Sequence, residues 1–506
     1  MKHPYKVSLA SLLLSIVITP LANAARDDYV DSRGLGYLDK CIDLFSIDDN
    51  ENKENIASIF SYDDQGNINS TAYAIVKRNS TKCFKFGDLG YYKVLFSGEE
   101  GRSYNISIIN NKVPLNFQMG VVTHFGNLSQ STNILKTIQL LKAAGIGWVR
   151  DELSWQNVEK KKGIFEFPAQ YDTYVNTLRA EGLKTLIVLD YGNNNYGGTK
   201  NIKSSIQPFA NYAENVVMKY GDYINHWEVW NEPKPSQFGD RGWDTYAQLL
   251  SSVYSRIKSV QKNSVVIGCG GGGAGGGPGG DCIQAVARQY NGDISDAYSI
   301  HPYLTHSPES GYQALNSPFK GLGGYINIRT VTKMLKPFYD KTKKSIYITE
   351  IGWPSSSENK RFSDSQQAAY VLRTYLLVRQ GDLFPVVFWY DFRDDGIDKN
   401  NKEHNFGMLK NDYTPKMSYI AVSNMNSLLY KYKWVRNIID GDGVIVSEFS
   451  DETNLIQVGW SYDNKTHEIP TDKRTRYIVD WQGKKTQSMN GNWKLSEMPS
   501  YRILSQ

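Results

Sequence analysis

The spacing of hydrophobic positions changes twice along the 506-residue chain. In the middle, from about residue 113 to 430, short apolar runs alternate with longer segments whose apolar residues recur at helical spacing. The helical spacing marks, for instance, residues 132–144, 246–260 and 365–379. The apolar runs predict strands at 117–122, 147–150, 184–190, 224–230, 264–269, 297–301, 345–350 and 386–391.

Eight strands that alternate with helices are typical of a (β/α)8 or TIM barrel. The alternative is a doubly wound open sheet, which usually has fewer strands and a phosphate-binding loop after the first strand. No such loop follows residues 117–122. The predicted fold class is therefore α/β, with a TIM barrel at its centre.

The regions before and after the barrel have the shorter period of β-structure. Turn-forming residues separate runs of alternating character, at 72–76, 91–96 and 104–109 and again at 444–446, 455–459, 477–480 and 501–504. We expect a small β-sandwich domain on each side of the barrel. The predicted division is a signal peptide over 1–24, an N-terminal β-sandwich domain over 25–112, the barrel over 113–430 and a C-terminal β-sandwich domain over 431–506.

The first residues predict export. Lys2 and Lys6 precede an apolar stretch over 7–21, and Ala22-Asn23-Ala24 offers small residues for cleavage after Ala24. A membrane anchor is the alternative, but the stretch is short and contains Pro20. We expect a periplasmic or secreted protein with no membrane anchor after cleavage.

The four cysteines fit an exported protein. Cys41, Cys83, Cys269 and Cys282 allow three pairings. Proximity along the chain favours Cys41 with Cys83 and Cys269 with Cys282. A metal site is the alternative, but no Cys-x-x-Cys spacing exists and the histidines are scattered, so we expect disulfides and no metal.

Charge and composition exclude some partners. The net charge of +5 is spread along the chain without a basic run, so nucleic acid is not an expected partner. Aromatic residues make up 13% of the chain, with 34 tyrosines and 11 tryptophans. Such rings stack on sugars but also fill β-rich cores, so they favour a carbohydrate ligand only slightly.

A glycine-rich tract over 270–280 contains nine glycines. A phosphate-binding loop would end in Gly-Lys-Ser or Gly-Lys-Thr at the start of a helix, whereas this tract ends in Asp281-Cys282. We interpret it as a flexible spacer loop after the fifth strand, at the rim where it could also line a cleft.

Two short segments carry the chemistry. Residues 227–233, Trp-Glu-Val-Trp-Asn-Glu-Pro, end the fourth predicted strand, and residues 347–354, Tyr-Ile-Thr-Glu-Ile-Gly-Trp-Pro, end the seventh. The carboxyl ends of all barrel strands face one mouth. Glu232 and Glu350 are therefore expected to face each other across it.

Paired carboxyl groups are what glycoside hydrolysis requires. One protonates the departing oxygen, and the other attacks the sugar or activates water. A separation of about 5 Å predicts retention of configuration and about 6.5–9.5 Å predicts inversion. We also expect the ionised partner to raise the pKa of the acid, so that one carboxyl group stays protonated near neutrality.

The two motifs resemble the acid/base and nucleophile segments of clan A glycoside hydrolases, and the chain looks most like family 39, including its bacterial exopolysaccharide-processing endoglycosidases. The resemblance spans residues 118–389, and the C-terminal β-domain fits it, whereas the N-terminal β-domain is not a firm part of the family pattern. It implies that Glu232 is the acid/base, that Glu350 is the nucleophile, and that Asn231 binds the sugar 2-hydroxyl.

Other residues near the mouth are expected to bind substrate or to hold the pair. Arg150 could keep Glu350 ionised, His301 and Tyr303 resemble the partners of the clan's nucleophile, and Trp389 is the expected stacking floor. His124 and Asp190 are candidates for binding hydroxyl groups. Each of these also has a purely structural interpretation as a core ion pair or packing residue, and Glu228, deeper on the fourth strand, is expected to be a buried structural carboxylate.

The sequence thus predicts a retaining β-glycosidase that hydrolyses an extracellular or capsular polysaccharide, endo-acting and without a cofactor. An exo-acting β-xylosidase-like enzyme on the same fold is one alternative, and a non-catalytic polysaccharide-binding protein is another. A metallohydrolase is disfavoured because the chain has no His-Glu-x-x-His motif.

Overall fold

The structure is a computed structural model, and it describes residues 34–45, 54–63, 66–77, 81–96, 103–130, 132–239, 242–271, 280–290, 293–310, 312–313, 325–356, 362–487 and 491–505. The predicted signal peptide over 1–24 and most of the glycine-rich tract, residues 272–279, lie outside the described residues. Among the helices of the described ranges, none has both the length and the apolar character needed to cross a bilayer.

Eight parallel strands close into a barrel in the order β10-β11-β12-β13-β16-β17-β8-β9. This order follows the sequence once around the ring, with β8 as the first barrel strand, and it confirms the predicted α/β fold class with a TIM barrel. The strands are β8 (Asn116–Val122), β9 (Ile146–Glu152), β10 (Lys184–Leu189), β11 (His226–Val229), β12 (Val265–Gly268), β13 (Ala297–Ile300), β16 (Ile346–Ile351) and β17 (Val387–Trp389).

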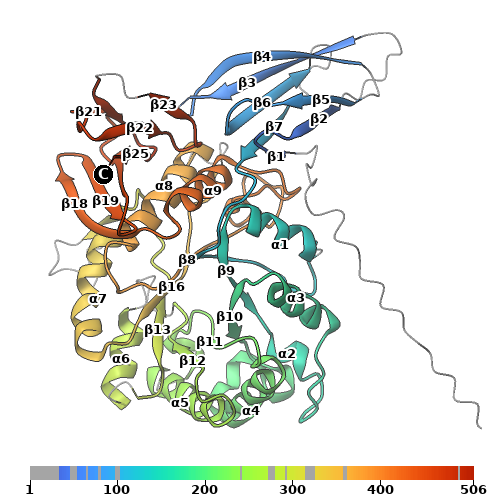
Figure 1. The fold of residues 1–506 in the computed structure, drawn as a ribbon. Helices are drawn as coiled ribbons and strands as arrows, with labels where there is room; N and C mark the ends of the chain where they lie inside the picture. Colours follow the sequence, from blue (N-terminus) through green and yellow to red (C-terminus); the bar gives the residue numbers. More distant parts are fainter. Residues whose placement is uncertain are drawn as a thin grey trace, which may run out of the picture.

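A helix follows each barrel strand and packs on the outside of the barrel (Figure 1). Polar N-cap side chains start several of them: Asn133 accepts a hydrogen bond from the Lys136 amide, and Ser363 forms a capping box with Gln366. The helices are α1 (Ile134–Ala143), α2 (Trp155–Val158) with α3 (Ala169–Ala180), α4 (Ile202–Tyr220), α5 (Gly242–Val260), α6 (Gly280–Tyr290), α7 (Ile328–Thr342), α8 (Asp364–Val378) and α9 (Met417–Leu429).

Alternate residues of the barrel strands face opposite ways, because side chains of a strand alternate between its two faces. One set fills the barrel interior and forms its own apolar cluster, with Val122, Trp148, Leu186, Val188, Ile267, Ala297, Tyr347, Val386 and Phe388. The other set packs against the helices, with Val121, Val149, Ile187, Val229, Ile348 and Trp389 among its members. Residues that continue the interior set past the strand ends therefore face the mouth.

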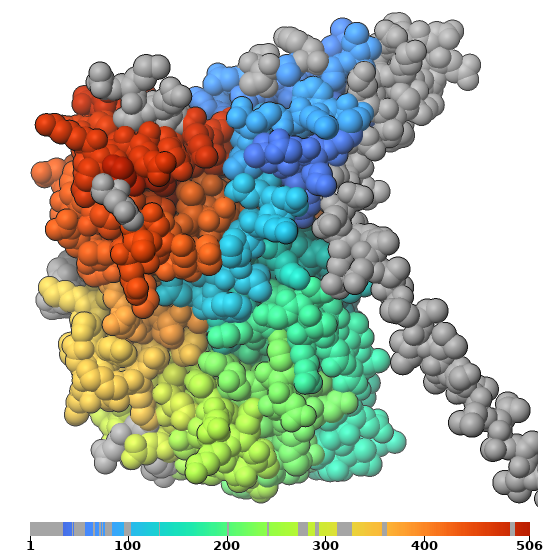
Figure 2. Space-filling model, viewed as in Figure 1, coloured from blue at the N-terminus to red at the C-terminus, as the bar shows by residue number. Residues whose placement is uncertain are grey.

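Two β-structured regions lie side by side above the barrel in the views of Figures 1 and 2. In the N-terminal region, β1 (Leu35–Tyr37), β7 (Ser103–Ile109), β6 (Gly90–Phe96), β3 (Glu54–Tyr62) and β4 (Ile68–Lys77) form one sheet, and β2 (Cys41–Phe45) pairs with β5 (Thr81–Lys85). Ile42, Leu44, Ile59 and Val94 share an apolar core between these sheets.

The C-terminal region has the same kind of construction. Its larger sheet has the order β18 (Lys433–Gly441), β19 (Val444–Ser450), β20 (Leu455–Ser461), β25 (Ser500–Leu504), β22 (Thr475–Val479) and β23 (Lys485–Gln487), and β21 (His467–Ile469) pairs with β24 (Trp493–Leu495). Val446, Trp493 and Leu495 share a core between the two sheets. The predicted boundaries fall between β7 and β8 and between α9 and β18; the division into domains stays a prediction.

Both predicted disulfides are present. Cys41 on β2 is bonded to Cys83 on β5, and Cys269 at the end of β12 is bonded to Cys282 in α6. The first joins two paired strands, and the second spans the glycine-rich tract. The pairings inferred from proximity along the chain are thereby confirmed.

Candidate active site

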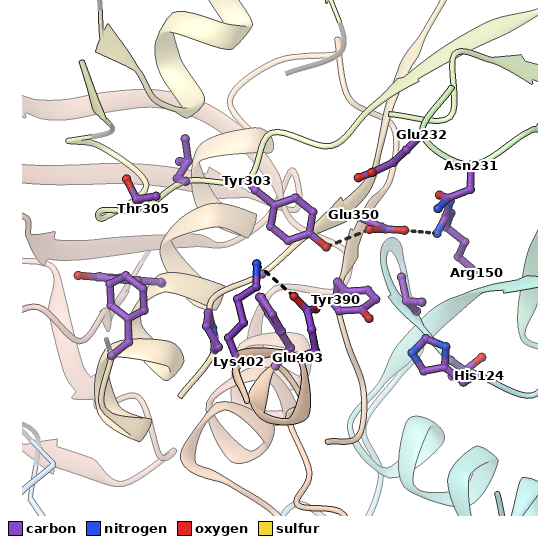
Figure 3. Close-up of a pocket in the computed structure, with 18 of the residues that line it drawn as sticks. His124, Arg150, Asn231, Glu232, Tyr303, Thr305, Glu350, Tyr390, Lys402 and Glu403 are labelled. Atoms are coloured by element: carbon purple, nitrogen blue, oxygen red, sulfur yellow. Dashed lines mark hydrogen bonds and ion pairs between the residues drawn. The ribbon is translucent and has the colours of Figure 1, made fainter. Parts of the chain in front are cut away.

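A pocket of about 1140 Å³ opens at the carboxyl ends of the barrel strands. Glu232 and Glu350 line it, together with Arg150, Asn231 and Tyr303. Figure 3 shows these five side chains converging toward one space, with Asn231 and Glu232 as neighbours in the turn after β11 and the others from different parts of the barrel. The structure thus brings together residues that lie up to 200 positions apart in the sequence.

The alternation of side chains along the barrel strands determines which residues form much of this pocket. His124, Arg150, Asp190 and His301 continue the interior set of β8, β9, β10 and β13. His124, Arg150 and Asp190 line the pocket, while His301 is buried beside the two glutamates. Their positions follow from parity alone, that is, from the alternation of side chains between the two faces of a strand.

Trp389 does not line the pocket, contrary to our expectation that it forms a stacking floor. It is fully buried in the core between barrel and helices, where its ring stacks on Trp353 at a centroid distance of 5.7 Å. Tyr390, the next residue, lines the pocket instead. The prediction is wrong because it ignored parity: Val386 and Phe388 point into the barrel, so Tyr390 and not Trp389 reaches the mouth.

Glu350 reaches the pocket through an irregularity of its strand. Tyr347 faces the barrel interior and Ile348 faces the helices, so regular alternation would turn residue 350 outward. The pairing of β16 with β17 shifts register between Ile348 and Ile351. Such a β-bulge re-aims the side chains that follow it, and here it turns Glu350 toward the mouth.

Glu232 lies in a turn just after β11 rather than on the strand itself. Its φ of 45° and the φ of 70° at Trp230 are in the left-handed region, which non-glycine residues rarely adopt. The Glu232 amide donates to the Gly270 carbonyl at 2.7 Å. A Cβ on Gly270 would lie 2.0 Å from the Trp230 carbonyl oxygen, so only glycine permits this approach.

Gly271 has a similar role beside His301. A Cβ there would lie 2.1 Å from the imidazole ring. The first two glycines of the tract, Gly270 and Gly271, therefore pack against the turn that carries Glu232 and against His301, which the interpretation as a flexible spacer did not foresee. The interpretation of residues 272–279 lies outside the described part of the chain.

Arg150 connects three parts of the site. Its Nε donates to Glu228 at 2.7 Å, one Nη to Glu350 at 2.7 Å and the other to the Asn231 carbonyl oxygen at 2.8 Å. Asn231 in turn donates to the Tyr191 hydroxyl at 2.8 Å. Glu228 is fully buried, so this planar fork both neutralises a core carboxylate and orients Glu350.

His301 lies between the two glutamates. Its Nδ1 is 3.2 Å from Glu232 and 3.4 Å from Glu350, and its Nε2 is 3.0 Å from the Thr349 hydroxyl. The Tyr303 hydroxyl donates to the second oxygen of Glu350 at 2.9 Å. One oxygen of each glutamate and one ring nitrogen of His301 all lie within 4.8 Å of one another. The two carboxyl groups are therefore close enough to act on one bond.

The pKa of Glu232 is lowered from its ordinary value, chiefly by the hydrogen bond with His301; burial opposes this, and the charges of Lys234 and Arg150 support it. This direction is opposite to our expectation that the neighbouring carboxylate raises the pKa of the acid. The physical reason is that His301 stands between the two carboxyl groups and stabilises the ionised form of Glu232.

The hydrogen bond between His301 and Glu232 predicts that the pH profile of kcat/KM shifts in a His301→Phe variant. The new side chain keeps a ring against Gly271 but cannot hydrogen-bond to Glu232. A general acid must be protonated, so its pKa sets the alkaline limb of the pH profile of kcat/KM. Loss of the hydrogen bond raises that pKa, and the alkaline limb moves to higher pH. His226→Phe, at the opposite end of β11, is the matched control and should leave the limb in place. If the alkaline limb does not move in His301→Phe, this hydrogen bond does not lower the pKa of the general acid.

A second group of titratable residues surrounds His124, which lines the same pocket. His124 is 3.3 Å from Asp391 and 3.5 Å from Asp395. Burial alone would lower the pKa of His124, but these two carboxylates raise it to about 9, so the ring is a cation at neutral pH. Burial and the nearby charge of Glu152 raise the pKa of Asp190, whose carboxyl oxygens are buried. Roles for His124 and Asp190 in binding hydroxyl groups stay predictions.

Two clusters in the described residues have the geometry to hold a cation. They are His124 with Asp391 and Asp395, and Glu232 with His301 and Glu350. Hydrogen bonds or ion pairs within each cluster already account for its geometry. The expectation that the site uses no metal or cofactor stays a prediction.

Among the residues close to the two glutamates, sequence reasoning missed Tyr191, Thr349 and Tyr390. Tyr191 orients Asn231, Thr349 contacts His301, and Tyr390 lines the pocket. Tyr390 and Thr349 could have been found by counting alternate residues from the strand cores. Tyr191 could not, because it follows the end of β10 and its direction depends on the loop.

Comparison with known proteins identifies the class of this barrel. The model of the cellulase family, glycosyl hydrolase family 5, matches residues 110–390, which is more than half of the chain. The chain belongs to this family. It is a glycoside hydrolase, and the matched segment covers the barrel strands and both glutamate motifs.

Solved structures extend the likeness of this glycoside hydrolase beyond the barrel. A family 39 glycoside hydrolase from the gut symbiont Bacteroides cellulosilyticus WH2 is 29% identical, covers 94% of this chain and 99% of its own, and superposes with a TM-score of 0.80. A monomeric β-xylosidase from Caulobacter crescentus CB15 is 16% identical over 78% of this chain and 97% of its own, with a TM-score of 0.53, and shares the fold. The resemblance to clan A and to family 39 is confirmed.

Curated relatives match over short segments. "Probable inactive beta-glucosidase 25" of Arabidopsis thaliana is 31% identical over 119 residues, which is 21% of this chain and 22% of that protein. "Beta-glucosidase 40" of the same plant is 27% identical over 143 residues, 26% of this chain and 27% of that protein. The glycoside hydrolase thus spans about a quarter of the length of these relatives.

Proposed function

We propose that this glycoside hydrolase is a retaining β-glycosidase that works by double displacement, with Glu350 as nucleophile and Glu232 as acid/base. The observation that carries the proposal is the approach of one oxygen of each glutamate to within 4.8 Å. Inverting enzymes hold their carboxyl groups about 6.5–9.5 Å apart to admit a water molecule, whereas retaining enzymes hold them about 5–5.5 Å apart. The spacing here supports retention.

The first step forms a glycosyl-enzyme. The Glu350 carboxylate attacks the anomeric carbon while the bond from that carbon to the linking oxygen breaks, and Glu232 gives its proton to the departing oxygen. In the second step, Glu232 takes a proton from water, the water oxygen bonds to the anomeric carbon, and the bond to Glu350 breaks. The product keeps the configuration of the substrate, and both glutamates return to their starting protonation states.

The groups around Glu350 suit a nucleophile whose charge changes during the reaction. Arg150 and Tyr303 each donate to one of its oxygens; Arg150 is buried and Tyr303 is half-buried. Fixed donors in a buried site stabilise a carboxylate without reorganisation, which favours its ionised form before attack and after release. The contacts that hold Asn231 to Arg150 and Tyr191 support its proposed role in binding the hydroxyl group beside the anomeric carbon.

We further propose that the substrate is an extracellular or capsular polysaccharide and that cleavage is internal. The leader-like N-terminal sequence and the two disulfides support a periplasmic or secreted location. The pocket of about 1140 Å³ exceeds the roughly 300–1,000 Å³ of pockets that enclose one drug-sized ligand, which supports an elongated substrate.

Product analysis tests the proposal. The mature protein is incubated with a panel of bacterial exopolysaccharides, cellulose and xylan, the first anomer released is observed by proton NMR, and the products are sized by mass spectrometry. We expect the β-anomer first and a ladder of oligosaccharides. An α-anomer as first product contradicts the retaining mechanism, and release of monosaccharides alone replaces the endo mode by the exo-acting alternative.

A further inference from the structure

The active-site pocket does not end at the barrel. Tyr462 and Asn464, in the turn between β20 and β21, line it together with residues of the barrel. A second, smaller hollow shares Asn464 with the pocket and is also lined by Ser365 at the start of α8 and by Ser496. In Figure 3, Tyr303 lies between Glu232 and Glu350 on one side and Thr305 on the other, so the lining runs well past the catalytic pair.

The turn that carries Tyr462 and Asn464 is held in one conformation by the residue between them. Asp463 accepts hydrogen bonds from the Ser461 hydroxyl at 2.9 Å and the Lys465 amide at 3.1 Å, and its carboxylate lies 3.0 Å from His467 Nε2. These contacts fix the backbone on both sides of Asp463. A binding surface ordered in advance loses little conformational entropy when its ligand arrives.

The turn is also tied to the loop after β13, which lines the same pocket. Two residues before Tyr462, the Trp460 indole N–H donates to Glu309 at 2.8 Å, and Arg373 of α8 donates to both oxygens of Glu309. The next residue, Ser310, lines the pocket. Glu309, Arg373 and Trp460 are all buried. The C-terminal region and the loop after β13 are therefore fixed at a constant spacing.

We propose that Tyr462 and Asn464 form a distal subsite that binds further, uncharged sugar units of the same polysaccharide. The inference rests on the proposed function, which it deepens. The face of a tyrosine ring is apolar and packs on the C–H face of a sugar, and the Asn464 amide can both donate to and accept from hydroxyl groups. Lys402 and Glu403 on the same pocket form an ion pair at 3.1 Å, so their charges largely cancel and an uncharged chain fits.

The test measures binding as a function of chain length. In a Glu350→Gln background, which prevents turnover, isothermal titration calorimetry compares cellohexaose with cellobiose and xylohexaose with xylobiose. We expect one hexasaccharide to bind at least about tenfold more tightly than its disaccharide. Tyr462→Ala should remove most of that preference, as the loss of one aromatic contact predicts, and Asn464→Gly, chosen because φ is 62° there, should reduce it.

Tyr430→Ala is the matched control, because Tyr430 is an exposed tyrosine at the end of α9 and is absent from the lining of the pocket. It should keep the full preference. The proposal is overturned if neither hexasaccharide binds more tightly than its disaccharide, if Tyr462→Ala keeps the preference, or if Tyr430→Ala loses it equally. If the affinity does not rise with chain length but hydrolysis of 4-nitrophenyl β-glycosides still requires Glu232 and Glu350, only the proposed subsite is ruled out. If hydrolysis persists in both glutamate variants, the proposed function is ruled out, and the binding result remains valid by itself.

Discussion

Glu350→Gln is expected to lower kcat by about ten-thousandfold or more on every substrate, because the amide cannot form the glycosyl-enzyme bond. Glu232→Gln should lower kcat by about 100- to 10,000-fold on polysaccharide, as loss of a general acid predicts. It should have far less effect on the first step with a dinitrophenyl glycoside, whose leaving group needs no proton. Steady-state rates and the pre-steady-state burst of dinitrophenol measure both effects.

Azide separates the two roles further. In Glu232→Ala, azide attacks the glycosyl-enzyme without a base, the carbon–nitrogen bond forms as the bond to Glu350 breaks, and the glycosyl azide keeps the β-configuration. In Glu350→Ala, azide replaces the nucleophile and gives the α-azide. Glu403→Gln, on the same pocket but outside the hydrogen-bonded group around the catalytic pair, is the control. A folded Glu350→Gln protein with kcat within tenfold of the parent contradicts the assignment.

Arg150→Met is expected to lower the free energy of unfolding by about 3–5 kcal/mol, because it leaves a buried carboxylate without its partner. Glu228 is fully buried and Arg150 is 3% exposed, so water cannot compensate for the lost ion pair. Glu350 and Asn231 also lose their contacts to the guanidinium group, so kcat/KM should fall as well. Urea denaturation and kinetics on an aryl glycoside measure the two effects.

Two further variants show whether the fork geometry matters. Arg150→Lys keeps the charge but cannot make three directed contacts, so it should recover part of the stability and little of the activity. Arg256→Met removes an ion pair with Glu214 on the surface, where Arg256 is 43% exposed; its cost should be below about 1 kcal/mol. Equal stability of the parent and Arg150→Met would rule out the structural role of this buried network.

The C-terminal region has a part in the site that no motif signals. Trp460 and Arg373 converge on Glu309, and these residues come from three regions of the chain more than 60 positions apart. In the sequence each has the appearance of an ordinary surface or core residue. Only the packing of the C-terminal sheet on α8 shows that Glu309 links the β20–β21 turn to the loop beside Glu232 and Glu350.

The sequence by itself determined the barrel, the order of its strands and the placement of Glu232 and Glu350 at the ends of the fourth and seventh barrel strands, and it favoured the two disulfide pairings that the structure contains. These are consequences of local periodicity, chain proximity and the rule that parallel strands share one mouth. Parity would also have given Tyr390 in place of Trp389, had it been applied to β17.

Only the tertiary structure decided how the two glutamates meet. The bulge that turns Glu350 inward and the left-handed turn at Glu232 depend on pairing with β17 and on contact with Gly270. The direction of the pKa shift at Glu232 depends on His301 lying between the carboxyl groups. These features arise from contacts between segments distant in sequence, whose distances and burial the order of residues does not specify.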